Sequence, residues 1–315
     1  MKIKFTKLQG SGNDYLYIDG INDMPACLNG SDNFYSELAV KISDRHFGAG
    51  SDGIIIILPP SPQTATRLSS VPLDSGAQSL KAVLEVKPDF RMRMFNADGS
   101  EGEMCGNGIR CFAKYVYDKH LTDKKNINIE TLAGVKTVEV FLSEGSGTVK
   151  EAKVFMGVPE FESGKIPALF QKREIINEII TVRDKDFTVS CVSMGNPHCV
   201  TFIDDVKNFD VHYYGSAIEN SPMFPKRINI EFVQRLDDGN VLVRTWERGS
   251  GETLACGTGA CAVYSVMKKT GKTDIGKNEL KVNLFGGTLK ISGDLNKGIY
   301  MVGPAEEVFC GYFDF

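Results

Sequence analysis

An internal repeat constrains the fold of this chain more than any other feature of its sequence. Residues 93–108 align without gaps with residues 244–259, at an offset of 151 positions. An arginine, a glutamate, a cysteine and two glycines coincide, and an aromatic residue faces an aromatic residue. A second pair, Ser-Gly-Asn-Asp at 11–14 and Met-Gly-Asn-Pro at 194–197, precedes the two segments in the same order. Two similar halves predict two similar lobes, with an interface at which matching motifs can face each other.

The two halves differ in the length of chain between their paired motifs. Gly12 lies 93 residues before Cys105, whereas Gly195 lies 61 residues before Cys256. The excess of 32 residues (93 minus 61) fits the proline- and serine-rich stretch at 59–89, which we interpret as an insertion in the first half.

Strand-like segments rich in β-branched and aromatic residues outnumber the helical ones. Strands are predicted at residues 15–19, 53–58, 91–95, 126–131, 188–193, 227–233, 241–246 and 281–284. Helices are predicted, from apolar residues at three- and four-residue spacing, at 33–44, 106–119, 206–218 and 257–269. Because the helices are too few to cross over between every pair of strands, we expect an α+β fold with antiparallel or mixed sheets.

The length of 315 residues suggests about two domains and is enough for a full hydrophobic core. We expect an N-terminal lobe at residues 1–135, a C-terminal lobe at 136–300 and a C-terminal segment at 301–315, whose last strand could return to the first lobe. Lysine and arginine (36) nearly balance aspartate and glutamate (40), giving a net charge of −4. This balance argues against nucleic-acid and membrane partners and leaves a small molecule as the default ligand.

The chain begins without the apolar stretch of a signal peptide, and its longest aliphatic run, residues 54–58, is too short to span a membrane, so we expect a cytoplasmic protein. In that compartment the eight cysteines are expected to be free thiols. No two lie at Cys-x-x-Cys spacing, and with four histidines there is no zinc or thioredoxin pattern, so no metal is predicted. The thiols must then be explained by packing or by catalysis.

Each repeated cysteine segment reads as strand, loop, cysteine, and Gly-x-Gly opening a helix. A thiol at a helix N-terminus lies near unpaired N–H groups, which lower its pKa, and the same groups can hold a carboxylate. Glycines at 106, 108, 257 and 259 let the backbone approach a ligand closely. A single copy would indicate a structural turn, but one copy in each half favours a site.

Two thiols in facing lobes suit two-base chemistry at one carbon. A base on one face removes a proton and an acid on the opposite face returns one, which inverts the stereocentre in the manner of racemases and epimerases. Nothing in the sequence indicates a lysine site for pyridoxal phosphate. Without a cofactor, N–H donors at the two helix starts would have to stabilise the developing carbanion charge.

Several longer motifs make a family resemblance specific. They are residues 95–100 (Phe-Asn-Ala-Asp-Gly-Ser), 104–108 (Met-Cys-Gly-Asn-Gly), 247–253 (Glu-Arg-Gly-Ser-Gly-Glu-Thr) and 255–259 (Ala-Cys-Gly-Thr-Gly), supported by 10–14, 45–48, 194–198 and 227–229. With these motifs the chain closely resembles the diaminopimelate epimerases, whereas proline racemases share only the Cys-Gly-x-Gly pair. The resemblance implies two pseudo-symmetric lobes, each a sheet wrapped around a central helix, with the active site in the cleft between them. It also implies a cofactor-independent enzyme, expected to be a homodimer, that interconverts LL- and meso-2,6-diaminopimelate in lysine and cell-wall synthesis.

The resemblance also implies roles for individual residues. Cys105 and Cys256 match the family's base and acid, with His198 and Glu247 as further catalytic candidates. The matching substrate-binding side chains are Asn13, Asn96, Asn196, Asn229, Glu247 and Arg248, and the backbone cradles for the reacting carboxylate are Gly106, Asn107, Gly257 and Thr258. The sequence departs from the pattern at Gly53, where many relatives carry a glutamine that contacts the substrate.

Structural interpretations remain open for several of these residues. Asn13 and Asn196 lie beside glycines and could be turn residues, and His198 could be a buried structural histidine. Glu252 is better explained as a salt-bridge or capping partner than as a ligand. Five of the other cysteines are most simply core residues: Cys111, Cys191, Cys199, Cys261 and Cys310.

Two other functions compete with the epimerase. One is another racemase or isomerase of the same architecture, against which Glu247-Arg248 and the asparagines argue, because they suit a substrate with a second amino-acid end. The other is a binding protein in which Cys105 and Cys256 form a switchable disulfide.

Overall fold

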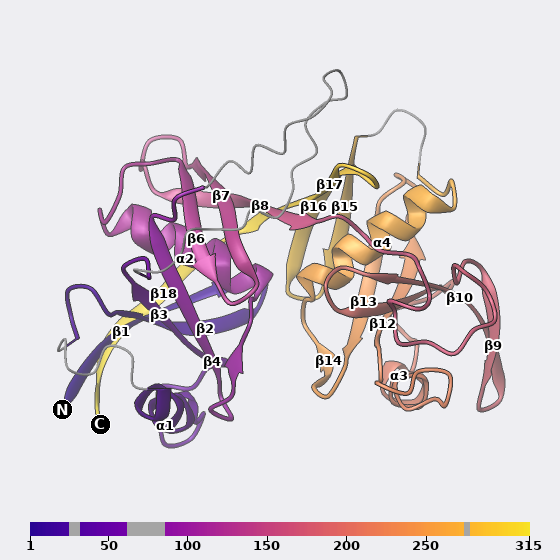
Figure 1. The fold of residues 1–315 in the computed structure, drawn as a ribbon, viewed down its shortest axis with the longest axis horizontal. Helices are drawn as coiled ribbons and strands as arrows, with labels where there is room; N and C mark the ends of the chain where they lie inside the picture. The colour runs from indigo at the N-terminus through magenta and orange to yellow at the C-terminus, as the bar shows by residue number, and fades with distance from the viewer. Residues whose placement is uncertain (25–31, 62–85, 274–277) are drawn as a thin grey trace. The chain divides into compact units, whose positions relative to one another are not determined.

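The computed structural model describes residues 1–24, 32–61, 86–273 and 278–315, so most of the insertion predicted at 59–89 lies outside the described residues. The chain forms two compact units (Figure 1). Unit 1 contains Met1–Val154 and Gly303–Phe315, and unit 2 contains Phe155–Val302. The sequence places the lobe boundary at 135/136, whereas the contacts divide the chain after Val154, because residues 134–142 pair with the preceding strand of unit 1.

Unit 1 is a mixed sheet in which most neighbouring strands are antiparallel. The strands follow the order β18 (Glu306–Asp314), β1 (Lys2–Gly10), β2 (Asn13–Asp19), β3 (Gly53–Leu58), β4 (Phe90–Asn96), β6 (Asn126–Thr131), β7 (Gly134–Leu142) and β8 (Val149–Gly157), with β5 (Glu101–Gly102) also paired to β4. The β2–β3 and β4–β6 pairs are parallel. The strand nearest the C-terminus, β18, therefore returns to pair with β1.

Unit 2 repeats this topology. Its strands follow the order β9 (Glu178–Val182), β10 (Lys185–Ser193), β11 (Pro197–Phe202), β12 (Asn229–Arg235), β13 (Val241–Glu247), β15 (Glu279–Leu284), β16 (Gly287–Asp294) and β17 (Gly298–Pro304), with β14 (Gly251–Thr253) paired to β13. The parallel pairs, β11–β12 and β13–β15, occupy the positions equivalent to those of unit 1. The predicted two-lobed α+β fold is confirmed.

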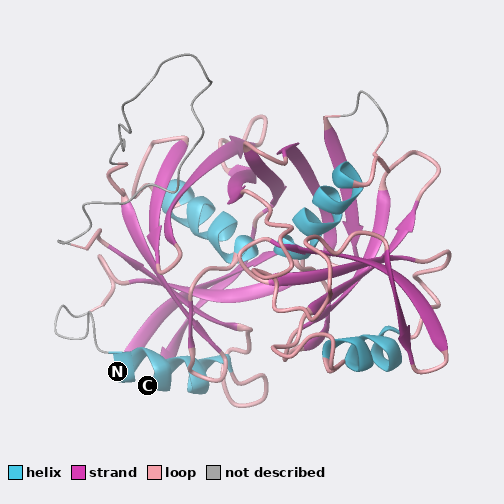
Figure 2. Cartoon of the chain, turned by 45° about the vertical axis from the view of Figure 1, so that its right-hand side comes forward, coloured by secondary structure: helices cyan, strands magenta, loops and turns pink. Residues whose placement is uncertain are grey.

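Each unit has one central helix and one outer helix among the described residues (Figure 2). The central helices, α2 (Gly106–Asp118) and α4 (Gly257–Lys269), are buried along nearly their whole length and pack against strands from both ends of their sheet. The outer helices are α1 (Asp32–Ser43) and α3 (Val211–Glu219). The sheet of each unit wraps around its central helix, so that in α2 even Arg110 and Lys114 are buried. None of the described helices is long and apolar enough to cross a membrane.

The aliphatic run of β3 shows how the layers of unit 1 are built. All five residues from Ile54 to Leu58 are buried, because the strand is covered on both faces. Ile54 and Ile56 belong to the core that packs on α1, whereas the Ile55 side chain lies toward Gly108 of α2.

One predicted helix begins too early. The apolar pattern predicts residues 206–218, but α3 begins at Val211, with Asp210 accepting a hydrogen bond from the Tyr213 N–H as its N-cap. The guanidinium Nη1 of Arg244 binds the carbonyl oxygens of residues 206, 207 and 209. Those carbonyls therefore do not serve as acceptors within a helix.

Candidate active site

Cys105 caps the helix that it precedes. Its backbone is extended (φ −125°, ψ 122°), and its Sγ accepts a hydrogen bond from the Gly108 N–H at 3.3 Å. The thiol in turn donates to Oδ1 of Asn13 at 3.2 Å. The backbone N–H groups of Gly106 and Asn107 occupy the first helical positions, where no carbonyl of the same helix can bind them. This end of α2 can therefore offer both a thiol and anion-binding donors.

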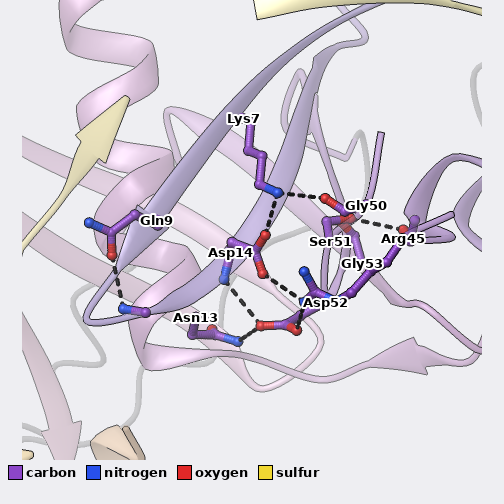
Figure 3. A network of polar contacts seen from close by, with 11 residues as sticks. Lys7, Gln9, Asn13, Asp14, Arg45, Gly50, Ser51, Asp52 and Gly53 are labelled. Atoms are coloured by element: carbon purple, nitrogen blue, oxygen red, sulfur yellow. Dashed lines mark hydrogen bonds and ion pairs between the residues drawn. The ribbon is translucent and has the colours of Figure 1, made fainter. Parts of the chain in front are cut away.

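Asn13 lies just after the tight turn between β1 and β2. Ser11 and Gly12 both have positive φ (55° and 83°), which directs the chain back along β1. The side-chain Nδ2 of Asn13 donates to Oδ2 of Asp52 at 2.7 Å (Figure 3). Asn13 is thus both a residue that follows a turn and a direct neighbour of Cys105.

Asn96 ends β4 of the same unit, on the chain that leads to Cys105. Its Nδ2 donates to the Ser100 hydroxyl at 3.0 Å across a turn that Asp98 closes by accepting from the Ser100 N–H. Behind the turn, Arg93 holds Glu101 with two hydrogen bonds of 2.7 and 2.8 Å. The same fork joins Arg244 to Glu252 in unit 2, which is the salt-bridge role expected for Glu252.

Cys256 repeats the arrangement of Cys105 in unit 2. It is the extended N-cap of α4 (φ −118°, ψ 113°), and its Sγ accepts from the Gly259 N–H at 3.4 Å. The Thr258 hydroxyl lies 3.4 Å from the same sulfur. Unlike Cys105, which is partly exposed, Cys256 is buried.

A chain of hydrogen bonds leads away from Cys256 into the core of unit 2. Nδ2 of Asn196 donates to the Thr258 hydroxyl at 3.3 Å, and Oδ1 of Asn196 lies 3.0 Å from Nε2 of His198. Nδ1 of His198 lies 2.7 Å from Oε1 of Glu231. Both His198 and Glu231 are completely buried. His198 is therefore a buried histidine that is also connected to the candidate site.

The pKa of the Cys256 thiol differs from the value that its position at a helix N-terminus predicts. Burial raises the pKa of the Cys256 thiol well above its usual value, and the carboxylates of Glu247 and Glu231 raise it further. The Thr258 and Gly259 hydrogen bonds oppose this shift without cancelling it. The predicted lowering of the pKa is thus wrong for Cys256, because desolvation outweighs the helix N-terminus.

Glu247 lies at the end of β13 and accepts a hydrogen bond of 2.6 Å from the Thr253 hydroxyl. Burial raises the pKa of its carboxyl above the usual value, partly opposed by Thr253, His198 and Cys256. A carboxyl beside a thiol in a desolvated environment is suited to exchanging protons with it.

Asn229 and Arg248 are joined to each other through the backbone. Asn229 is buried, its Nδ2 donates to the Pro197 carbonyl at 2.7 Å, and its Oδ1 accepts from the Arg248 N–H at 2.9 Å. The Arg248 side chain is exposed and donates to the Lys226 carbonyl at 3.4 Å. Asn229 therefore fixes the backbone from which Arg248 extends.

The second glycine of each Cys-Gly-x-Gly motif is needed for close packing, which the sequence did not predict. A Cβ at Gly108 would lie 2.8 Å from Cδ1 of Ile55, and one at Gly259 would lie 2.5 Å from Oε1 of Glu231. At Gly53 a Cβ would overlap the carbonyl oxygen of Phe95, so this backbone leaves no room for a side chain there.

The cysteines expected to be core residues divide into two groups. Those found buried are Cys111, Cys191, Cys199 and Cys261. For Cys310 the expectation is wrong, because it lies on β18, an edge strand of unit 1 with an exposed face. Within the described ranges no group of three or more His, Cys, Asp or Glu side chains could hold a metal ion.

Two carboxylates near the site were missed by sequence reasoning, the fully buried Glu231 and the partly exposed Asp52. Glu231 interrupts the apolar residues of β12, and an ionisable residue in a fully buried strand was a usable signal. Asp52, which binds Asn13, lies in a short loop and has no comparable signal. Burial and the neighbouring Asp14 raise the pKa of Asp52 above its usual value.

Comparisons with known proteins agree with these motifs. A family model described as diaminopimelate epimerase matches residues 5–161 and 190–308. The diaminopimelate epimerase of Methanococcus maripaludis strain C5 is 45% identical over 313 residues, covering 99% of this chain and 100% of that protein. That of Acetivibrio thermocellus is 42% identical over 313 residues, covering 99% of each.

Solved structures of other proteins share the fold. A probable proline racemase from Agrobacterium radiobacter K84 gives a TM-score of 0.65 at 12% identity, covering 99% of this chain and 93% of that chain. A methylitaconate-delta-isomerase gives 0.59 at 14% identity, covering 99% and 95%. At these identities the likeness concerns the fold alone.

Proposed function

Because the chain belongs to the diaminopimelate epimerase family, we propose that it interconverts LL-2,6-diaminopimelate and meso-2,6-diaminopimelate by a two-cysteine mechanism. The observation that carries the mechanism is the equivalent placement of Cys105 and Cys256. Each is the N-cap of the central helix of its unit, and each accepts an N–H bond from the third residue after it.

In this mechanism the two cysteines exchange a proton with one α-carbon. The thiolate of one takes the α-proton and becomes a thiol, leaving the electron pair of the broken C–H bond on the carbon. The thiol of the other gives its proton to the opposite face of that carbon and becomes a thiolate. The configuration is inverted, no electrons are transferred, and the reverse reaction restores the first protonation state.

The surroundings of Cys256 support a division of roles. Burial, Glu247 and Glu231 raise the pKa of the Cys256 thiol and so favour the protonated form. We therefore assign Cys256 as the proton donor in one direction of the reaction. Cys105, whose thiol donates to Asn13 in this structure, acts as the base in that direction once it has lost this proton. Glu247, whose carboxyl lies beside Cys256, would receive or supply the proton of Cys256 between turnovers, whereas His198 would orient Asn196 and, through it, the Thr258 hydroxyl.

Substrate binding follows from the same geometry. The unpaired N–H groups at the starts of α2 and α4 are donors for the reacting carboxylate and its developing charge. At the distal end, the exposed Arg248 guanidinium suits the second carboxylate, and the amides of Asn13, Asn96 and Asn196 can serve carboxylate or ammonium groups.

We further propose a pathway, a location and an assembly for this activity. The product suits lysine biosynthesis, the enzyme would act in the cytoplasm without a cofactor, and we propose a homodimer. Light scattering of the purified protein tests the oligomeric state.

The decisive experiment measures solvent deuterium. In D2O the purified protein should introduce deuterium at the α-carbon of diaminopimelate while LL and meso forms equilibrate. The Cys105→Ala and Cys256→Ala variants should lose epimerisation, whereas Cys111→Ala and Cys261→Ala, matched controls inside the same two helices, should retain it. Normal turnover in either of the first two variants would refute the two-cysteine mechanism, and no deuterium uptake by the unmodified protein would refute the activity.

A further inference from the structure

A carboxylate lies directly behind the amide that contacts Cys105. Oδ2 of Asp52 accepts hydrogen bonds from Nδ2 of Asn13 at 2.7 Å and from the Asp14 N–H at 3.1 Å (Figure 3). Its other oxygen, Oδ1, accepts from Nη2 of Arg45 at 2.8 Å. Both oxygens of Asp52 are thus occupied by donors on three different groups.

These contacts determine which way the Asn13 amide faces. An ionised carboxylate can only accept hydrogen bonds, so it selects the NH2 group of Asn13 and not its carbonyl oxygen. The oxygen Oδ1 is then turned to the Cys105 Sγ, 3.2 Å away. If the amide turned over, a donor would face the sulfur and two acceptors would face each other at Asp52.

The carboxylate itself is held firmly. Arg45 bridges Asp52 and Asp14 through Nη2, at 2.8 and 3.2 Å. Lys7 contacts Asp14 at 2.6 Å and donates to the Gly50 carbonyl at 2.6 Å, and the backbone N–H of Asp52 donates to the Asp14 carbonyl at 2.8 Å. The loop that carries Asp52 is therefore fixed to β1 and β2 from several sides.

We propose that Asp52 is a positioning residue for catalysis, which acts by orienting the Asn13 amide so that its oxygen faces Cys105 and, in the proposed reaction, its remaining N–H faces the substrate. This inference rests on the proposed function for its kinetic part only. Asp52 touches neither the sulfur nor the reacting carbon, and its effect passes entirely through Asn13.

A double-mutant cycle tests whether the effect of Asp52 on catalysis passes through Asn13. Asp52→Asn replaces one acceptor by a donor of the same shape, which leaves either Asn13 and Asp14 or Arg45 facing an NH2 group. We expect it to lower kcat/KM at least about tenfold, because the Asn13 amide would no longer be held with its oxygen toward Cys105 and its N–H toward the substrate. In an Asn13→Ala background the same substitution should cost less than about threefold, because the group that Asp52 orients is absent.

Asp89→Asn is the matched control. Asp89 also accepts from a backbone N–H (Asn128, 3.0 Å) and from a cation (Lys124, 2.6 Å) in unit 1, but none of these residues belongs to the candidate site. The kcat/KM of the Asp89→Asn protein should equal that of the unmodified protein. An Asp52→Asn enzyme with unchanged kcat/KM, or with the same loss in both backgrounds, would overturn the inference.

Alkylation of Cys105 supplies a readout that does not need turnover. With Asn13 released, the thiol loses its acceptor, so the thiolate is favoured and iodoacetamide should modify Cys105 about threefold faster or more at pH 7. Peptide mass spectrometry measures this rate against the exposed Cys310 of the same molecule. An unchanged Cys105 rate in Asp52→Asn would reject the positioning role, whether or not the unmodified protein epimerises diaminopimelate.

Discussion

Replacing Gly259 by alanine should destabilise unit 2, although alanine is the better helix former. Gly259 is the third residue of α4, and a Cβ there would lie 2.5 Å from Oε1 of Glu231 and 3.2 Å from the Cβ of Cys256. Ordinary contact begins at about 3.4 Å, so the carboxylate must move by about 0.9 Å (3.4 minus 2.5). That oxygen is bound to His198 at 2.7 Å in a site with no solvent exposure.

The magnitude follows from two opposing contributions. Alanine in place of glycine within a helix stabilises by about 1 kcal/mol. Disrupting the buried bond between Glu231 and His198 costs about 1.5–3 kcal/mol, as a hydrogen bond to a charged group. We therefore expect a net loss of about 1 kcal/mol in the free energy of unfolding, together with a fall in kcat through the contacts that join His198 to Cys256.

The single tryptophan allows the unfolding of unit 2 to be measured separately. Trp246, the only tryptophan of the chain, lies in β13 of unit 2, so its fluorescence during urea denaturation reports on the unit that contains Gly259. Gly108→Ala is the matched control at the equivalent helix position of unit 1. Its Cβ would meet the terminal methyl of Ile55 and would break no hydrogen bond of unit 2, so the transition reported by Trp246 should be unchanged. A Gly259→Ala protein as stable and as active as the unmodified one would refute this reasoning.

Three further outcomes are expected. Arg248→Met should impair diaminopimelate turnover without changing the urea midpoint, and lysine, which lacks the distal carboxylate, should be a very poor substrate; comparable turnover of lysine would contradict the assignment of Arg248. Lys7→Met should reduce the free energy of unfolding by more above pH 4 than well below it. Burial alone would raise the pKa of Asp14, yet the hydrogen bonds from Lys7 and Arg45 hold it below 3.8, so the part of the loss that comes from the Asp14 pair is present above 3.8 and disappears as the pH falls through the folded value, while the part that comes from the Gly50 carbonyl remains. At pH 8 iodoacetamide should label Cys310 and spare Cys111, whose pKa burial raises to about 11; rapid labelling of Cys111 in the folded protein would argue against its burial.

The repeat predicted the centre of each unit well. The offset of 151 residues relates α2 to α4 and β4 to β13 residue for residue. This agreement has a local cause, since the Cys-Gly-x-Gly segment and the apolar pattern after it specify the helix start and the buried helix without distant partners.

Features that depend on distant partners could not be predicted in the same way. Asp52 is 39 residues from Asn13, and Glu231 is 33 residues from His198, so neither pair is visible as a motif. The raised pKa of Cys256 has the same origin, because the dominant cause is burial by the surrounding sheet. The first strand was missed although exposed Lys2 and Lys4 alternate with buried Ile3 and Phe5, because its lysines reduce its resemblance to a typical strand.

The return of β18 to unit 1 has a consequence for synthesis on the ribosome. Residues 155–302 are translated before residues 303–315, so every strand of unit 2 can emerge while unit 1 still lacks the strand that covers β1. Until then the hydrogen-bonding edge of β1 is open, and such an edge can pair with other chains. Unit 1, whose first strands precede unit 2 in the chain, is therefore completed only after residues 306–314 have been translated, because these residues close that edge.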